Sequence, residues 1–331
     1  NEEDGKGEVT SFGALCTAMS ATVGTGNIVG IATAVVAGGP GALFWMWLAA
    51  IFGMATKFSE GLLAVKFRTM DKKGHVLGGP FYYIENGMGQ KWRWLAKAFA
   101  FFGMCVALFG MGTFTQINSI SSAVTGFFDP AMSHTVNILG GEFSIATVIG
   151  GLFTAVLAGL VIIGGFKLPA ALLLIVQHAF GLQAFGAGMF GAILIAMQFG
   201  LARGIFANEA GLGSAPIAAA AAKTNEPARQ GLVTMTQTFI DSIIICSMTG
   251  LALVMTNTYG IPGLEGAAVT NAAFQAGLPF LPPEVVSFIL MVCLALFGFT
   301  TILGWNYYGE RCFEYFFNRN ARGLKIYRWL Y

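Results

Sequence analysis

The sequence predicts an integral membrane protein built of transmembrane helices. Of the 331 residues, 56% are apolar and only 10% are charged, whereas a soluble domain carries about 25% charged residues. Glycine is abundant, with 45 residues, and small residues let membrane helices pack closely. The net charge is +2, so composition excludes a soluble globular domain and gives no charged field to attract a nucleic-acid partner.

The sequence also contains a series of apolar runs long enough to cross a bilayer, which takes about 20 helical residues. Several runs exceed that length, which indicates tilt, breaks or extension beyond the bilayer. The runs cover residues 12–37, 39–65, 95–127, 143–166, 188–222, 231–255 and 284–317.

The basic residues between these runs predict which connections face the cytoplasm, because Lys and Arg collect on that side. They are dense in two segments and absent from two others. We therefore predict residues 66–97, 167, 223–230 and 310–331 inside the cell, and residues 128–142 and 256–283 outside.

This topology leaves one crossing unaccounted for. Lys167 and Lys223 are both predicted inside, so the helix ending at Lys223 must start outside, near residue 188. The apolar core LPAALLLIV in residues 168–187 is too short to cross. We expect that one spanning helix is missing between Gly165 and Pro169. The C-terminal RGLKIYRWLY also begins an apolar run and stops, as if cut.

Two of the runs contain residues that weaken a helix in mid-membrane. Residues 21–30 (ATVGTGNIVG) hold Gly and polar side chains, and residues 206–216 (FANEAGLGSAP) hold a carboxylate, Gly and Pro. Irregular backbone at membrane depth is tolerated only where it is buried in protein or lines a cavity. Paired interruptions point to a secondary-transporter site, where free N–H groups face a substrate carboxylate and free carbonyls face a cation such as Na⁺.

Other readings of the first interruption are weaker. GTGNIVG departs from the dinucleotide fingerprint, because the third Gly is out of place and no strand precedes it. Gly26 and Gly30 alone would fit a helix-packing face. The second interruption favours a site.

Ionisable residues inside the runs are further candidates. Lys57 and Glu60 lie one turn apart, which predicts a structural ion pair. Arg203 needs a partner or a water-filled vestibule. Glu209 and Asp241 are candidates for gating or packing networks. The His and Cys residues show neither metal-ligand spacing nor a Cys-x-x-Cys pair, and we assign them no metal: His75, His134, His178, Cys16, Cys105, Cys246, Cys293 and Cys312.

Six motifs then resemble one known family, the alanine/glycine:cation symporters (sodium:alanine symporter family). The resemblance runs from about residue 8 to the end of the chain. It is carried by residues 22–28 (TVGTGNI), 38–47 (GGPGALFWMW), 53–58 (GMATKF), 78–83 (GGPFYY), 204–216 (GIFANEAGLGSAP) and 302–312 (ILGWNYYGERC).

The resemblance implies a leucine-transporter-type fold of two inverted five-helix repeats, preceded by one extra helix. Residues 1–331 are then a single transmembrane domain, with the first repeat at about 10–167 and an incomplete second repeat at about 188–331. The two discontinuous helices are the first helices of the repeats. The extra helix, the fifth core helix and the last two core helices are expected to be missing, and the fifth is the one that charge parity requires.

The resemblance also implies a multi-pass plasma-membrane transporter of a prokaryote, not an enzyme, that imports alanine and glycine with Na⁺ and contacts membrane lipid. Position by position, the substrate site would be Thr25, Gly26, Asn27, Gln116, Phe206, Asn208, Thr301 and Trp305. The Na⁺ ligands would be backbone oxygens near Ser20 and Val23, the Phe297 carbonyl and the hydroxyls of Thr300 and Thr301, an uncharged set that suits a monovalent cation.

Two points of this site stay open. Trp305, four residues after Thr301 and on the same helix face, fits either a pocket wall or an interface anchor. Ala207 and Thr113 stand where many family members have Ser and Asn, which leaves the amino-acid preference open.

Three other functions compete with Na⁺ symport. A proton-coupled symporter is favoured by Glu209. A small-solute channel would favour symmetric pore-lining repeats rather than two unlike broken helices. A membrane enzyme lacks support, because the sequence has neither H-E-x-x-H nor G-x-S-x-G.

Overall fold

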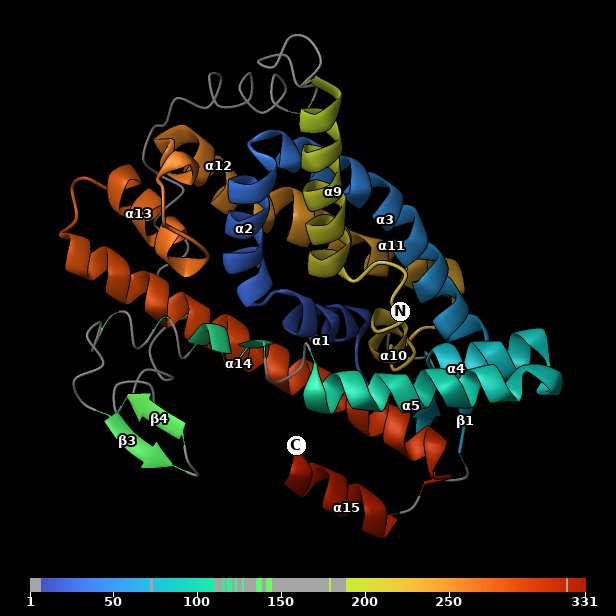
Figure 1. The fold of residues 1–331 in the computed structure, drawn as a ribbon. Helices are drawn as coiled ribbons and strands as arrows, with labels where there is room; N and C mark the ends of the chain where they lie inside the picture. The colour runs from blue at the N-terminus through green and yellow to red at the C-terminus, as the bar shows by residue number, and fades with distance from the viewer. Residues whose placement is uncertain are drawn as a thin grey trace.

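The computed structural model describes residues 7–71, 74–110, 115, 116, 118–120, 123, 127, 135–138, 141–144, 179, 189–319 and 321–331. Within them, five helices are long and apolar enough to cross a membrane, and one bent helix pair makes a sixth if it counts as a single span. Helices dominate the fold (Figure 1), which confirms the predicted all-α membrane protein.

The bent pair is the first interrupted run. Helix α1 (Ser11–Thr22) is followed by the 3-10 turn η2 (Thr25–Asn27) and helix α2 (Val29–Gly38), with a bend of 64° between the two halves. Val23 and Gly24 have extended backbone, which ends α1. Residues 23–28 are called the first break. The interruption predicted at residues 21–30 is confirmed.

The second interrupted run has a different local structure. Helix α9 (Met189–Asn208) ends before helix α10 (Ala215–Ala219) begins. Residues 209–214, called the second break, contain three left-handed φ angles: 55° at Glu209, 85° at Gly211 and 75° at Gly213. Left-handed backbone is open to Gly and strained for other residues, so the two glycines make this turn possible. The prediction of a break within residues 206–216 is confirmed.

The two broken helices lie side by side and antiparallel. Helix α2 packs against α9, while α1 packs against α10. Because the first half of each broken helix touches the second half of the other, the two breaks meet at the centre of the molecule (Figure 1).

Longer helices surround this pair. Helix α3 (Gly41–Lys66) packs against α9 and α11 (Pro227–Thr238), and α5 (Arg93–Phe109) packs against α14 (Pro283–Phe316). Helix α11 continues through the π-helix η7 (Phe239–Ile245) into α12 (Cys246–Thr256) as one span. The remaining elements are β1 (Thr69–Met70), β2 (Val76–Leu77), α4 (Pro80–Tyr83), η3 (Ile84–Met88), η4 (Gln90–Trp92), β3 (Thr135–Ile138), β4 (Gly141–Ser144), η8 (Thr258–Gly260), α13 (Ala267–Gly277) and α15 (Ala321–Leu330).

Some predicted boundaries are wrong. The helix expected over 95–127 is interrupted at Gly110, where the backbone leaves the helical region and α5 ends. The described residues beyond it, 115, 116, 118–120, 123 and 127, are helical again. The run expected from residue 143 begins inside β4, which pairs antiparallel with β3. The rest of that run, and the gap predicted between Gly165 and Pro169, lie outside the described residues. Helices α13 and α15 fall in segments where no helix was expected, because both are too short to register as spans.

Three segments predicted inside the cell meet at one end of the molecule. The guanidinium of Arg68 donates to the carbonyls of Ala222, at 2.7 Å, and Thr224, at 2.5 Å. Arg319 forms a 3.3 Å salt bridge with Asp71. These contacts join residues 66–97, the segment after α10 and the end of α14, as a shared side of the membrane requires.

Candidate functional site

A small cavity lies between the two breaks and is called the central cavity. Its volume is about 20 Å³, where one water molecule needs roughly 10–15 Å³. Both breaks and two further helical segments contribute to its wall. The lining residues are Ala21, Thr22, Gly24, Gly26, Gln116, Phe206, Ala207, Glu209, Thr301 and Trp305.

The wall on the side of the first break consists of backbone and neutral polar groups. The Thr25 backbone N–H and hydroxyl both donate to Gln116 Oε1, at 3.2 and 2.8 Å. A Cβ on Gly24 would lie 2.5 Å from Thr301 Oγ1, so only glycine lets these segments approach so closely. A Cβ on Gly26 would lie 3.7 Å from the Phe206 ring, which places that glycine opposite an aromatic wall.

Two of the predicted substrate residues face away from the cavity. Asn27 is fully buried; its Oδ1 accepts from the Gly24 N–H at 2.9 Å and its Nδ2 donates to Asp241 Oδ1 at 2.6 Å. Asn208 Nδ2 donates to Ser242 Oγ at 3.0 Å. Both asparagines therefore tie the breaks to η7. The Asn27–Asp241 bond shows that Asp241 joins two helices.

The structure thus separates the eight predicted substrate residues into two groups. Thr25 is bonded to the wall, and Asn27 and Asn208 lie behind it. The five on the cavity wall are Gly26, Gln116, Phe206, Thr301 and Trp305.

The predicted Na⁺ oxygens gather where α14 passes the first break. Thr301 Oγ1 lies 2.9 Å from the Phe297 carbonyl and 3.4 Å from the Val23 carbonyl. Thr300 Oγ1 donates to the same Phe297 carbonyl at 3.1 Å. The Ser20 hydroxyl donates to the carbonyl of Thr17 within α1, at 2.8 Å, and the predicted role of the Ser20 backbone oxygen stays a prediction. Four of the five predicted ligands are therefore linked, and all offer uncharged oxygens.

The wall on the side of the second break carries charge. Glu209 is buried; Ser214 Oγ donates to its Oε2 at 2.5 Å and Trp305 Nε1 donates to its Oε1 at 3.1 Å. The Trp305 indole therefore faces the protein centre as a pocket wall, rather than serving as an interface anchor. Glu60 Oε1 accepts from the Gly213 N–H at 3.0 Å, which fixes the same turn from α3.

The predicted ion pair between Lys57 and Glu60 is wrong. Lys57 is fully buried, and its Nζ has no hydrogen-bond partner among the described residues. Glu60 Oε1 instead accepts a hydrogen bond from the Gly213 N–H of the second break. Arg203 has an aromatic partner: its guanidinium lies 5.7 Å from the centre of the Phe206 ring, a cation–π contact.

The Cys and His residues were assigned no metal from their spacing. In the part of the chain that the structure describes, the five cysteines form no disulfide, and no group of three His, Cys, Asp or Glu side chains is placed to hold a metal ion. His134 and His178 lie outside it.

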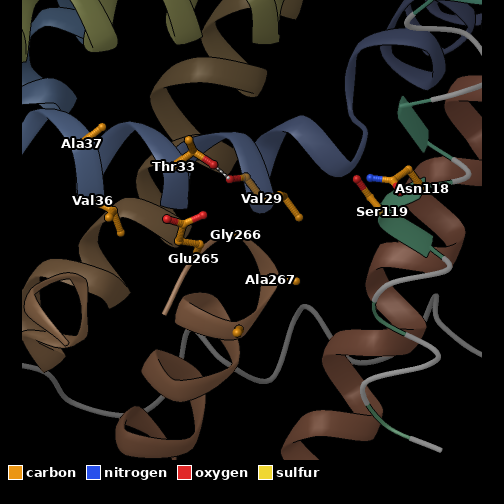
Figure 2. A pocket seen from close by; sticks show the side chains of 10 residues that line it. Val29, Thr33, Val36, Ala37, Asn118, Ser119, Glu265, Gly266 and Ala267 are labelled. Atoms are coloured by element: carbon orange, nitrogen blue, oxygen red, sulfur yellow. Dashed lines mark hydrogen bonds between the residues drawn. The ribbon is translucent and has the colours of Figure 1, made fainter. Parts of the chain in front are cut away.

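A larger, outer cavity of about 510 Å³ flanks α2 (Figure 2). Val29 and Thr33 of α2 line one side, Asn118 and Ser119 a second, and Glu265 a third. The same two segments that meet at the Thr25–Gln116 hydrogen bonds continue into its wall. Neighbouring residues of these two segments therefore line both cavities.

A multi-pass helical membrane protein with two antiparallel broken helices around a small polar cavity has the architecture of a secondary transporter. The comparison with known families agrees: the sodium:alanine symporter family model matches residues 1–172 and 166–331. The chain belongs to the sodium:alanine symporter family, whose members are transporters and not enzymes.

Relatives cover nearly all of the chain. An uncharacterized transporter of Haemophilus influenzae is 54% identical over 100% of this chain and 75% of its own length. The sodium/alanine symporter AgcS of Methanococcus maripaludis is 47% identical, over 99% of this chain and 74% of that protein. The probable sodium/glutamine symporter GlnT of Bacillus subtilis is 37% identical, over 98% of this chain and 68% of that protein.

Proposed function

We propose that this protein imports small neutral amino acids, alanine and glycine, together with Na⁺, by alternating access across the plasma membrane. The observation that carries the proposal is the pair of antiparallel broken helices whose breaks enclose one polar cavity. Such a pair is how two inverted repeats present a midplane site. We extend this to the leucine-transporter-type fold, with repeats at about 10–167 and 188–331.

The wall of the central cavity suits a small zwitterion. The first break brings the Gly26 backbone to the cavity wall, where its N–H would meet a carboxylate, and the carbonyls where α9 ends would meet the ammonium group. Phe206 and Trp305 close the remaining sides. Since the cavity of about 20 Å³ is smaller than alanine, the surrounding helices must move to admit it, as alternating access requires.

Side-chain size is the finer point of specificity. One relative is named for alanine and another, provisionally, for glutamine, so family membership alone does not fix the substrate. The two aromatic walls support the smaller choice here. Ala207 also lines the cavity, and we propose that it adjusts the room available to the substrate side chain.

Na⁺ is proposed to bind at the linked oxygens of Val23, Phe297, Thr300 and Thr301. Thr301 also lines the central cavity, so the ion and the substrate would share one side chain. That sharing would couple the two, because each would stabilise the position of Thr301 that the other needs.

We also propose that one helix is absent from this chain near residues 166–172. The two family matches overlap there, next to the gap that charge parity predicts. The alignment with the Haemophilus influenzae relative is 347 positions long although the chain has 331 residues, so the relative has residues within the matched stretch that this chain lacks. A native protein found by peptide mapping to be continuous through Phe166 and Lys167 would remove this proposal.

The test of function is uptake of labelled alanine by proteoliposomes, with an imposed Na⁺ gradient and with K⁺ in place of Na⁺. We expect accumulation against the alanine gradient only with Na⁺. Uptake that follows a pH gradient and ignores Na⁺ would favour the proton-coupled alternative. Downhill flux without any accumulation would favour a channel.

A further inference from the structure

The centre of the molecule holds more buried acidic groups than basic ones. Glu60, Glu209 and Asp241 are 7%, 1% and 0% exposed. Lys57, 0% exposed, is the fully buried cation among the described residues. An ionised group without a partner is costly in such surroundings. Three carboxylates facing one ammonium group would leave two negative charges without a counter-ion.

Hydrogen bonds hold these carboxyl groups without neutralising them. Glu209 accepts from Ser214 and Trp305, Asp241 accepts from Asn27, and Glu60 accepts from the backbone of Gly213. All of these donors are neutral.

Unpartnered polar atoms lie in the same cluster. Among the residues that the structure describes, the Lys57 ammonium has no hydrogen-bond partner, and neither has Glu60 Oε2 or the Tyr308 hydroxyl. The charge of Lys57 acts on Glu60, Glu209 and Asp241 together rather than closing one ion pair. The arrangement is therefore electrically incomplete, and its missing component is a small positive charge.

We propose that this cluster is a proton-binding site, separate from the Na⁺ oxygens, and that Glu209 is the group that takes up and releases the proton. Glu209 lines the central cavity, while Glu60 and Asp241 do not. Its Oε2 faces a hydroxyl, Ser214, that accepts a hydrogen bond as readily as it donates one. Protonated Glu209 can therefore donate to Ser214 while Trp305 still donates to Oε1.

The titratable groups that interact with Glu209 come from α3, η7 and α14. Lys57 and Glu60 stand on α3, Asp241 on η7 and Tyr308 on α14. Behind them, Tyr83 at the end of α4 acts on Glu60 and Cys246 at the start of α12 acts on Asp241, while Arg203 of α9 is turned to the Phe206 ring. The proton passes between cavity water and the Glu209 carboxyl, with no other bond made or broken.

This inference rests on the proposed function, because its assay is alanine uptake. Na⁺-driven uptake is measured in proteoliposomes across a wide pH range, with a pH-sensitive dye inside the vesicles. We expect the wild-type rate to vary with pH, and Glu209→Gln, which resembles the protonated side chain, to lose most of that variation. Exposed Glu284, in the first turn of α14, gives the matched control Glu284→Gln, which should keep the wild-type profile.

Lys57 provides a second test. Lys57→Met removes the cation, so the carboxyl groups hold their proton to higher pH and the profile should move by about one to three pH units. Lys57→Met/Glu60→Gln removes one charge of each sign and should return the profile towards wild type. If Glu209→Gln does not fold, the pH profiles of Lys57→Met and Lys57→Met/Glu60→Gln decide whether the cluster binds a proton.

Each outcome has a distinct meaning. Acidification of the vesicle interior during uptake supports the proton site. So does a pH profile of uptake that differs between wild type and Glu209→Gln without such acidification. A Glu209→Gln or Lys57→Met profile identical to wild type overturns it. A wild-type protein with no Na⁺-dependent alanine uptake overturns the proposed function instead.

Discussion

The two breaks differ in backbone and in charge. The first break, residues 23–28, has no positive φ angle, and its side chains bond to neutral groups such as Gln116. The second break, residues 209–214, has three positive φ angles and is held by carboxylates: its own Glu209 and Glu60 of α3. One break is therefore a bend held by neutral hydrogen-bond partners, and the other is a tight turn held by carboxyl groups.

This difference suggests a division of labour. A bend surrounded by neutral groups suits a substrate that arrives already balanced in charge. The second break is instead linked by hydrogen bonds to both α3 and α14. We expect substitutions in the second break to cost stability first, and substitutions around the first break to cost binding first.

Gly213→Ala should have the largest effect. Its φ of 75° is left-handed, and an added Cβ would lie 2.9 Å from both the Phe99 ring and the Pro80 ring. Left-handed backbone alone costs about 1–2 kcal/mol for other residues, and the clash adds to it. Thermal unfolding in detergent measures the loss.

Gly191→Ala in α9 is the control, because nothing lies within 4 Å of its added Cβ. It should unfold at or slightly above the wild-type temperature, since Ala favours a helix over Gly. Equal unfolding temperatures for the two variants would contradict the idea that the second break is a rigid turn.

Asn27→Ala should have the next largest effect, and it separates a structural role from a binding role. The change removes the acceptor for the Gly24 N–H and the donor to Asp241. A buried group left unpaired costs about 1–3 kcal/mol. Unfolding temperature and alanine affinity should fall together. Unchanged stability with lost affinity would return Asn27 to the substrate site.

The contrast also shows what the sequence could predict. Glycines and polar residues inside apolar runs located both breaks, and the family resemblance supplied residues that now share a wall, such as Gln116 and Trp305. The sequence could not show that Asn27 bonds to η7 rather than lining the cavity, because the partner of Asn27, Asp241, is 214 positions further along the chain. Pairing of Glu60 with Gly213 rather than Lys57 likewise depends on packing between distant helices.

Gln116→Ala should reduce binding more than stability. Gln116 Oε1 accepts both hydrogen bonds from Thr25, and its loss frees the first break to sample other shapes. A net cost near 1.4 kcal/mol, typical of a hydrogen bond, lowers alanine affinity about tenfold. Binding of labelled alanine to purified protein measures it. An unfolding temperature that drops as far as that of Gly213→Ala would contradict the division of labour.

The smallest expected effect is a difference in Na⁺ dependence between substitutions of two adjacent threonines on α14. Thr301 is 2% exposed, lines the central cavity and reaches the Val23 carbonyl, whereas Thr300 bonds only to Phe297 of its own helix among the contacts described. Valine keeps the shape of either side chain and removes one oxygen. Because Thr301 connects the first break to α14, Thr301→Val should raise the Na⁺ concentration for half-maximal uptake several-fold.

Thr300→Val should change the same quantity less, because the Phe297 carbonyl remains available to the ion without it. Li⁺ in place of Na⁺ sharpens the comparison, since losing an oxygen from the coordination shell affects the two ions differently. If the two variants shift the Na⁺ dependence equally, the ion does not bind between α14 and the first break. The neutral groups of the first break would then serve the substrate alone, and the ion would bind near the carboxyl groups of the second break.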